Sequence, residues 1–221
     1  MKQTLSFLKR LKRNNNTEWM HAHKQEYLGA KQEFEFLVQE LITRISLWDE
    51  KLPHLEPKQC IFRLNRDIRF SQDKSPYKDN FGAYFAYGGK KGGLPGYYLH
   101  ISPKECFAAG GVWMPESDKL LSIRRHIAED GEELEKILKN TAFKKVFSRP
   151  STEQVLVRPP KGFPSDHPQV ELLKLKSFTV SAPLLMKDVL SPGFGKMIDQ
   201  HFKLIKPFNR FLNQAIKGQK L

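Results

Sequence analysis

The chain has 221 residues, 39% of them hydrophobic, which is enough to bury a sizeable core and favours a single domain over residues 1–221. Its formal net charge of +13 at pH 7 favours anionic partners but does not define a function. The sequence has no apolar run near about 18 residues and no secretory signal, so we expect no membrane span and a cytoplasmic location with free thiols at Cys60 and Cys106.

The positive charge is unevenly distributed along the chain. Residues 58–91 hold 8 basic and 3 acidic residues, and residues 141–221 hold 14 and 5. The stretch between them is slightly acidic. Two separate regions therefore supply the basic character, and a fold that brings them together would form one basic surface.

The N-terminal part is predicted to be helical. Leu5, Leu8 and Leu11 indicate a short amphipathic helix that ends at the asparagines 14–16. A longer helix is expected from about Thr17 to a point before Pro53, because apolar residues recur three, four or seven apart. These residues are Tyr27, Phe34, Leu37, Leu41, Ile45 and Trp48.

The pattern changes to strand-like alternation from Cys60. Phe62, Leu64, Ile68 and Phe70 share one parity, and mostly charged residues take the other. Arg66 interrupts the apolar parity. An unbroken strand would place Arg63 and Arg69 roughly 20 Å apart, so a bend or bulge near residues 65–67 is required if these arginines converge on one ligand.

The remaining elements alternate between sheet and helix. Three antiparallel strands are expected near residues 80–87, 97–102 and 106–113, followed by helices within 115–139 and near Thr141. Residues 149–168 are expected to be irregular. A helix over 170–176, a β-like segment over 177–181 and a final helix from Ser191 with a kink at Pro207 are expected to follow. The fold class is therefore α+β, with an antiparallel sheet of about four or more strands packed against N- and C-terminal helices.

Several long blocks of the chain are distinctive. They are FLKRLKRNNNTEWM, CIFRLNRDIRFSQDKSPYKDNFGAYF, GYYLHISP, GGVWMPE and PKGFPSDHPQVELLKLKSF. In this order, over nearly the whole chain, they resemble the uncharacterised domain-of-unknown-function family numbered 2461. The resemblance implies one intracellular domain. It implies no particular activity, because that family consists mainly of conserved hypothetical proteins without established catalytic residues.

The segment from Arg63 to Lys78 is the strongest candidate for a binding site. Forked guanidinium groups and lysine point charges suit phosphate or carboxylate, so their concentration around two acids indicates an anion site. The alternative interpretation is that Arg63, Asp67, Arg69 and Asp73 pair across a sheet face while the lysines at 74 and 78 are solvated. The candidate anion-binding residues here are Arg63, Arg66, Arg69, Lys74, Tyr77 and Lys78.

Two further pairs complete the candidate site. Asp67 and His100 are the acid–base candidates, although a hydrogen-bonded sheet histidine beside a packed Tyr98 is the structural alternative for His100. Lys174 and Lys176 would complete an anion pocket if the C-terminal half folds over the sheet. Their alternative is a solvated helix end whose cations favour the helix dipole.

Three functions remain open from the sequence. The favoured one is binding, with or without catalysis, of a small phosphorylated or carboxylated anion at a site lined by Arg, Lys and Tyr. The alternatives are nonspecific nucleic-acid binding by a basic surface and a protein-interaction module for an acidic partner. No metal or cofactor is expected, because no metal-ligand or nucleotide-loop spacing occurs. Neither enzymatic activity nor oligomeric state follows from the pattern.

Overall fold

A computed structural model describes residues 1–50, 52, 54–69 and 72–217. The chain forms two compact units. The first comprises Met1–Lys91, Tyr98–Ala108 and Pro183–Asp199, and the second comprises Gly92–Tyr97, Ala109–Ala182 and Gln200–Leu221. The expectation of one domain over the whole chain stays a prediction.

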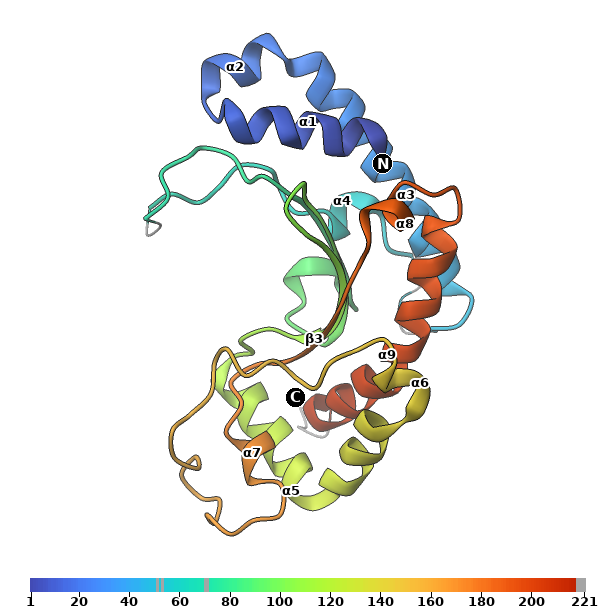
Figure 1. The fold of residues 1–221 in the computed structure, drawn as a ribbon. Helices are drawn as coiled ribbons and strands as arrows, with labels where there is room; N and C mark the ends of the chain where they lie inside the picture. The colour runs from blue at the N-terminus through green and yellow to red at the C-terminus, as the bar shows by residue number, and fades with distance from the viewer. Residues whose placement is uncertain (51, 53, 70–71, 218–221) are drawn as a thin grey trace. The chain divides into compact units, whose positions relative to one another are not determined.

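The described strands form a four-stranded antiparallel sheet in the order β1-β2-β3-β4 (Figure 1). The strands are β1 (Phe81–Phe85), β2 (Gly96–Ile101), β3 (Cys106–Val112) and β4 (Phe178–Pro183). A 3₁₀ turn, η1 (Gly89–Lys91), lies in the connection between β1 and β2. The predicted antiparallel meander and the α+β class are confirmed, and N- and C-terminal helices accompany the sheet.

The first unit contains the N-terminal helices. They are α1 (Lys2–Arg13), α2 (Thr17–Ala22), α3 (Lys24–Ser46) and α4 (Pro57–Cys60), joined later in the chain by α8 (Met186–Val189). The long helix predicted from Thr17 is divided at His23, whose ring Nδ1 donates to the carbonyl of Trp19 at 2.8 Å and whose ring stacks on Trp19. This side chain competes for a helical carbonyl and favours a break. Helix α3 ends at Ser46, and Pro53 lies outside the described residues.

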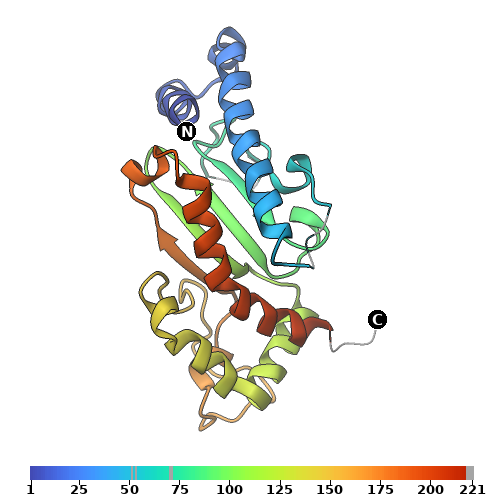
Figure 2. The same ribbon diagram turned by 90° about the vertical axis from the view of Figure 1, so that its right-hand side faces the viewer.

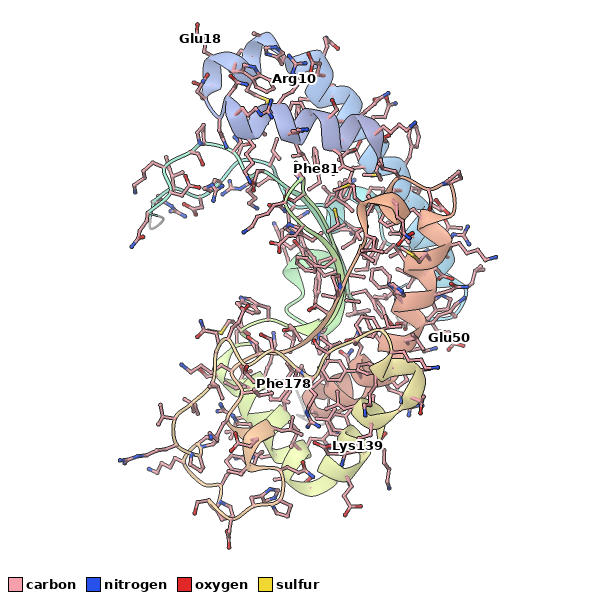
Figure 3. The ribbon with its side chains drawn as sticks, in the orientation of Figure 1. Arg10, Glu18, Glu50, Phe81, Lys139 and Phe178 are labelled. Atoms are coloured by element: carbon pink, nitrogen blue, oxygen red, sulfur yellow. The ribbon has the colours of Figure 1, made fainter. Side chains whose placement is uncertain are left out.

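Helix α3 provides much of the core of the first unit. Its residues Phe34, Leu41 and Ile45 are almost completely buried. The ring of Phe34 stacks on Phe81 of β1 with centroids 5.3 Å apart, and Figure 3 shows Phe81 at the end of the sheet below α1. The apolar periodicity of α3 therefore identified the side that packs on the sheet.

The second unit contains α5 (Ser117–Lys139), α6 (Thr141–Lys144), α7 (Val170–Leu173) and most of α9 (Phe194–Lys217). Asp130 has non-helical dihedral angles inside α5, near the predicted junction of two helices. Pro207 lies inside α9. Residues 149–168 contain no described helix or strand, as predicted for this proline-rich stretch. None of the helices in the described part of the chain is long and apolar enough to cross a membrane.

The part of the sheet in the first unit has one covered and one open face. Phe81, Ala83 and Leu99 point to the covered face and are at most 2% exposed. Helix α3 and the first turns of α9 lie on this side, joined by a 2.7 Å hydrogen bond from Trp48 to Asp199 (Figure 2). The opposite side, called the open face below, carries the partly exposed side chains of Tyr84, Tyr98, His100 and Phe107. An antiparallel sheet can leave one face exposed in this way.

Residues 61–80, called the basic loop below, show strand-like alternation in the sequence but form no strand in the described residues. Apart from two isolated bridges, Ile61 to Ala83 and Asn65 to Tyr77, the described part of the loop is irregular and extends away from the sheet (Figure 1). Charged residues on one parity and Arg66 on the other leave neither side apolar enough to be buried in a sheet. Phe70, part of the predicted pattern, lies outside the described residues.

Candidate anion-binding site

The two legs of the basic loop run antiparallel and pair through their backbones. The amide of Arg66 donates to the carbonyl of Pro76 at 2.9 Å, and the amide of Lys78 donates to the carbonyl of Leu64 at 2.8 Å. These bonds flank the bridge between Asn65 and Tyr77. The pairing brings Arg66 and Lys78, which are 12 residues apart in the sequence, onto adjoining legs.

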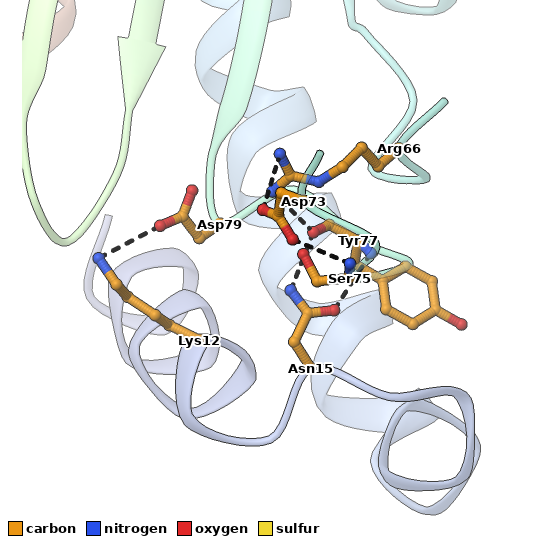
Figure 4. Close-up of polar contacts among 7 residues, drawn as sticks. All are labelled: Lys12, Asn15, Arg66, Asp73, Ser75, Tyr77 and Asp79. Atoms are coloured by element: carbon orange, nitrogen blue, oxygen red, sulfur yellow. Dashed lines mark hydrogen bonds and ion pairs between the residues drawn. The ribbon is translucent and has the colours of Figure 1, made fainter. Parts of the chain in front are cut away.

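A side-chain amide anchors the second leg to the N-terminal helices. Asn15 donates through Nδ2 to the carbonyl of Tyr77 at 2.9 Å, and its Oδ1 accepts from the amide of Tyr77 at 3.1 Å (Figure 4). Lys12 adds an ion pair with Asp79 at 3.3 Å. The side chain of Asn15 thus makes the two hydrogen bonds to the backbone of Tyr77 that an adjacent β-strand would make. Sequence reasoning assigned it only to a helix end, because no local signal indicates a partner 62 residues away.

Replacing Asn15 with alanine is expected to lower the free energy of unfolding by about 2 kcal/mol, because the amide of the buried Tyr77 loses its partner and the carbonyl keeps only the 3.3 Å bond from Arg66. Urea denaturation measures this loss. The matched control is Asn14→Ala, which removes an exposed bond to the carbonyl of Arg10. Equal effects of the two variants would contradict the anchoring role.

Several cations of the segment are paired within the loop. Arg69 binds the carboxylate of Asp67 with both Nε and Nη2, at 3.0 and 2.7 Å, and both side chains are exposed. Arg66 contacts Asp73 through Nη1 at 3.2 Å and donates through Nη2 to the carbonyl of Tyr77 at 3.3 Å (Figure 4). Lys74 donates to the carbonyl of residue 68 at 2.9 Å. The pair of Arg69 with Asp67 belongs to the structural alternative derived from the sequence, whereas Lys74 bonds a backbone carbonyl and Asp73 pairs with Arg66.

Arg63 and Lys78 differ in their contacts from the cations that are paired within the loop. Neither makes an ion pair with a carboxylate in the described part of the chain, although the charge of Arg63 helps to lower the pKa of Asp67. Lys78 is partly buried, and its Nζ lies 5.7 Å from the ring centroid of Phe62. Burial lowers the pKa of Lys78, and the positive charges of Arg63 and Arg66 lower it further. Three cations thus lie close enough to repel one another, and a bound anion would remove this repulsion.

A chain of ring contacts connects Lys78 to the open face. The ring of Phe62 meets the ring of Tyr98 edge-on with centroids 6.2 Å apart. The hydroxyl of Tyr98 lies 3.1 Å from Nδ1 of His100, whose ring stacks on Phe107. The structural alternative for His100, a hydrogen-bonded sheet histidine beside a packed tyrosine, describes these contacts. They connect Phe62, which lies beside Lys78, with His100 through the ring of Tyr98.

The two acid–base candidates do not share an interaction in the described structure. Hydrogen bonds from Arg69 hold the pKa of Asp67 below its usual value, so this carboxylate is ionised at neutral pH. Burial lowers the pKa of His100, although the negative charges of Glu105 and Asp79 oppose this shift. Besides Glu105, the acid whose charge acts on the pKa of His100 is therefore Asp79 and not Asp67. The sequence offered no sign of this, because Asp79 follows the basic segment at a turn.

Stability is expected to fall as the pH drops from about 7 to about 5. Burial lowers the pKa of both His100 and His201 below the ordinary value of 6.5. The unfolded chain therefore takes up protons in this range that the folded chain does not, so unfolding becomes more favourable. Thermal unfolding at several pH values measures the slope. His201→Gln should flatten it, and an unchanged slope in this variant and in His100→Gln would contradict the assignment.

Lys174 and Lys176 belong to the second unit. The Nζ of Lys174 pairs with Glu171 at 3.0 Å, at the end of α7, as the helix-end alternative suggests. The amide of Lys176 donates to the carbonyl of Gln154 at 3.0 Å. Convergence of these lysines with the basic loop stays a prediction.

Within the described residues, one group of side chains has the spacing of metal ligands. His126, Glu129 and Asp130 lie on α5 with ligand atoms within 4.8 Å of one another. His126 already contacts Asp130 at 3.5 Å and stacks on Phe211, and both carboxylates are exposed. Exposed acids on one helix turn are common without a metal, so we assign no metal site. Cys60 and Cys106 are buried free thiols, and burial raises the pKa of Cys60 to about 12, which makes it a poor nucleophile.

The fold and the arrangement of this site describe a class of protein, and the sequence matches a known family. The chain is an α+β protein in which a basic loop adjoins the open face of an antiparallel sheet. It belongs to the family described as "Conserved hypothetical protein (DUF2461)", whose model matches residues 3–211. No curated protein and no solved structure matches the chain significantly.

Proposed function

We propose that the protein binds a small phosphorylated or carboxylated anion at Arg63, Arg66 and Lys78. The observation that carries this proposal is the repulsion of Lys78 by Arg63 and Arg66, where Arg63 and Lys78 form no ion pair with a carboxylate in the described structure. Like charges repel when they are held together, and burial of Lys78 weakens the screening by water. An anion bound there would offset this unfavourable arrangement.

The contacts around the three cations assign supporting roles to their neighbours. Arg69 and Lys74 are exposed at the outer part of the basic loop and contribute positive potential. Tyr77 is 8% exposed and is held through its backbone by Asn15, so it positions the loop. The acid–base candidates for any turnover of the bound anion stay Asp67, on which the charge of Arg63 acts, and His100, which the rings of Tyr98 and Phe62 connect to Lys78.

A thermal-shift screen of the purified protein tests the proposal. The probes are inorganic phosphate, methyl phosphate, acetate, nucleotides and short single-stranded oligonucleotides, each at low and moderate salt. Saturable stabilisation by a small anion is expected, because a ligand that binds only the folded state raises the melting temperature. The shift should disappear in Lys78→Met. Stabilisation by no small anion would overturn the proposal.

The open face favours a second candidate, single-stranded nucleic acid. The partly exposed rings of Tyr84, Tyr98 and Phe107 lie beside a loop rich in cations, and bases stack on such rings. In that case only the oligonucleotides would stabilise the protein, with a steep loss on raising salt. A small anion that saturates the site in the same screen would exclude this as the main function. No shift with any probe would favour recognition of an acidic protein.

A further inference from the structure

Lys78 has a defined place on the second leg of the basic loop. Its amide bond to the carbonyl of Leu64, next to the bridge between the two legs, places Lys78 opposite Leu64 and diagonal to Arg66. The Nζ of Lys78 lies 5.7 Å from the ring centroid of Phe62. An apolar ring and the positive charge of a guanidinium group therefore act on the amine, and its side chain is only partly buried.

These surroundings disfavour the ammonium form of Lys78. In the described residues its Nζ forms no ion pair, because Asp73 contacts Arg66 and Asp79 contacts a lysine of α1. Burial lowers the pKa of Lys78, and the charges of Arg63 and Arg66 lower it further. A larger share of this side chain is therefore present as free amine at neutral pH than for an ordinary lysine. The free amine is the form that attacks carbonyl groups, and neighbouring cations activate it in this way.

The two arginines beside Lys78 have donors left for an acid group. Arg63 forms no ion pair with a carboxylate in the described residues. Arg66 uses Nη1 and Nη2 for Asp73 and the carbonyl of Tyr77, but its buried Nε has no hydrogen-bond partner there. A buried donor without a partner is unfavourable, so an acceptor oxygen would stabilise this group. The loop thus combines donors for an acid group with an activated amine.

We propose that Lys78 is a nucleophile that forms an imine with the carbonyl group of an anionic aldehyde or ketone, whose acid group is held by Arg63 and Arg66. This inference rests on the anion binding proposed above and narrows the ligand to phosphorylated or carboxylated carbonyl compounds. The lone pair of the free amine adds to the carbonyl carbon, and a proton passes from nitrogen to the carbonyl oxygen. The carbinolamine then loses water, so that a C=N bond replaces the C=O bond. The step consumes no oxidant or reductant.

Trapping with cyanoborohydride tests the imine in the full chain at pH 7.5. The probes are glycolaldehyde phosphate and glyoxylate, each an aldehyde with an acid group, and uncharged glycolaldehyde. Hydride from the reagent reduces an imine to a stable secondary amine, and peptide mass mapping measures the modification of each lysine. Lys78 is expected to react about tenfold faster than the exposed Lys9 with an anionic probe, because the acid group is held beside the amine. The two anionic probes distinguish phosphate from carboxylate.

A matched pair of variants tests the role of the arginines. Arg63→Gln should slow the modification of Lys78 by the preferred anionic probe about tenfold, because one charge-assisted contact is lost. Its effect with glycolaldehyde should be smaller, since this probe has no acid group to bind. Arg13→Gln removes the same charge from an exposed position on α1 and should leave both rates nearly unchanged. Methyl phosphate, which has no carbonyl group, should slow the modification of Lys78 by occupying the site.

The outcomes separate this inference from the proposed function. If methyl phosphate binds but Lys78 is modified no faster than Lys9, the anion site is retained and the imine is overturned. Equal rates at Lys78 with all three aldehydes, together with no binding of methyl phosphate, would overturn the proposed function and this inference with it. Faster modification by an anionic probe, slowed by methyl phosphate and by Arg63→Gln, would support both.

Discussion

Lys78→Met is expected to weaken binding of the small anion about 30-fold while leaving the fold intact or slightly more stable. Loss of one charge-assisted contact in a partly buried site lowers the binding free energy by about 2 kcal/mol. The fold does not suffer, because the charge removed is repelled by Arg63 and Arg66, and the methionine retains contact with Phe62. Titration with methyl phosphate and urea denaturation of the same variant measure the two effects.

The control for this prediction is Lys9→Met, which removes the same charge from an exposed position on α1. It should change anion affinity by less than about twofold, the effect of a distant, screened charge. If Lys78→Met destabilised the protein by as much as it weakened binding, Lys78 would have a structural role and the anion site would lose its main support. Equal effects of the two lysine variants would indicate a diffuse attraction rather than a site.

Gly111→Ala is expected to give the largest loss of stability, about 3 kcal/mol or more. Gly111 has φ of +110°, a region that alanine rarely adopts, and a Cβ there would lie 1.9 Å from the carbonyl oxygen of Phe178 on β4. The obstacle is backbone, so no side-chain rotation relieves it, and strain adds to overpacking. Urea or thermal denaturation of the purified variant measures the loss.

Gly193→Ala is the matched substitution, because no atom lies within 4 Å of a Cβ built there. It should change stability by no more than about 1 kcal/mol, with stabilisation the expected direction, since alanine restricts the unfolded chain. A loss of less than 1 kcal/mol in Gly111→Ala would show that β3 and β4 adjust more easily than this close approach implies. The anion affinity of a folded Gly111→Ala protein should match the wild type.

Local patterns were sufficient for most of the secondary structure. The spacing of Phe34, Leu41 and Ile45 indicated the buried side of α3, and the strand expected near residues 97–102 is β2. Each of these signals is contained in a short segment whose period matches that of the element. The alternation after Cys60 did not produce a strand, because in the described residues this segment pairs with its neighbours only at two isolated bridges.

The candidate site depended on contacts that no local pattern records. Sequence reasoning grouped the cations by proximity along the chain, yet in the described residues Arg69 forms an ion pair with Asp67, whereas Arg63 and Lys78 form no ion pair with a carboxylate. Asn15 became part of the site through a bond to Tyr77. Which residues pair is decided by three-dimensional distances between charges and by burial.

The sequence by itself determined the α+β class, the antiparallel order of the strands and the identity of the basic segment, because hydrophobic periodicity and charge composition are properties of the chain. Only the tertiary structure decided how the basic loop is anchored, which of its cations are neutralised and that Tyr98 is bonded to His100. Those features arise from backbone and side-chain groups that become neighbours only on folding. A hydrogen bond between two such groups, or the removal of water from around them, changes their energies and pKa values.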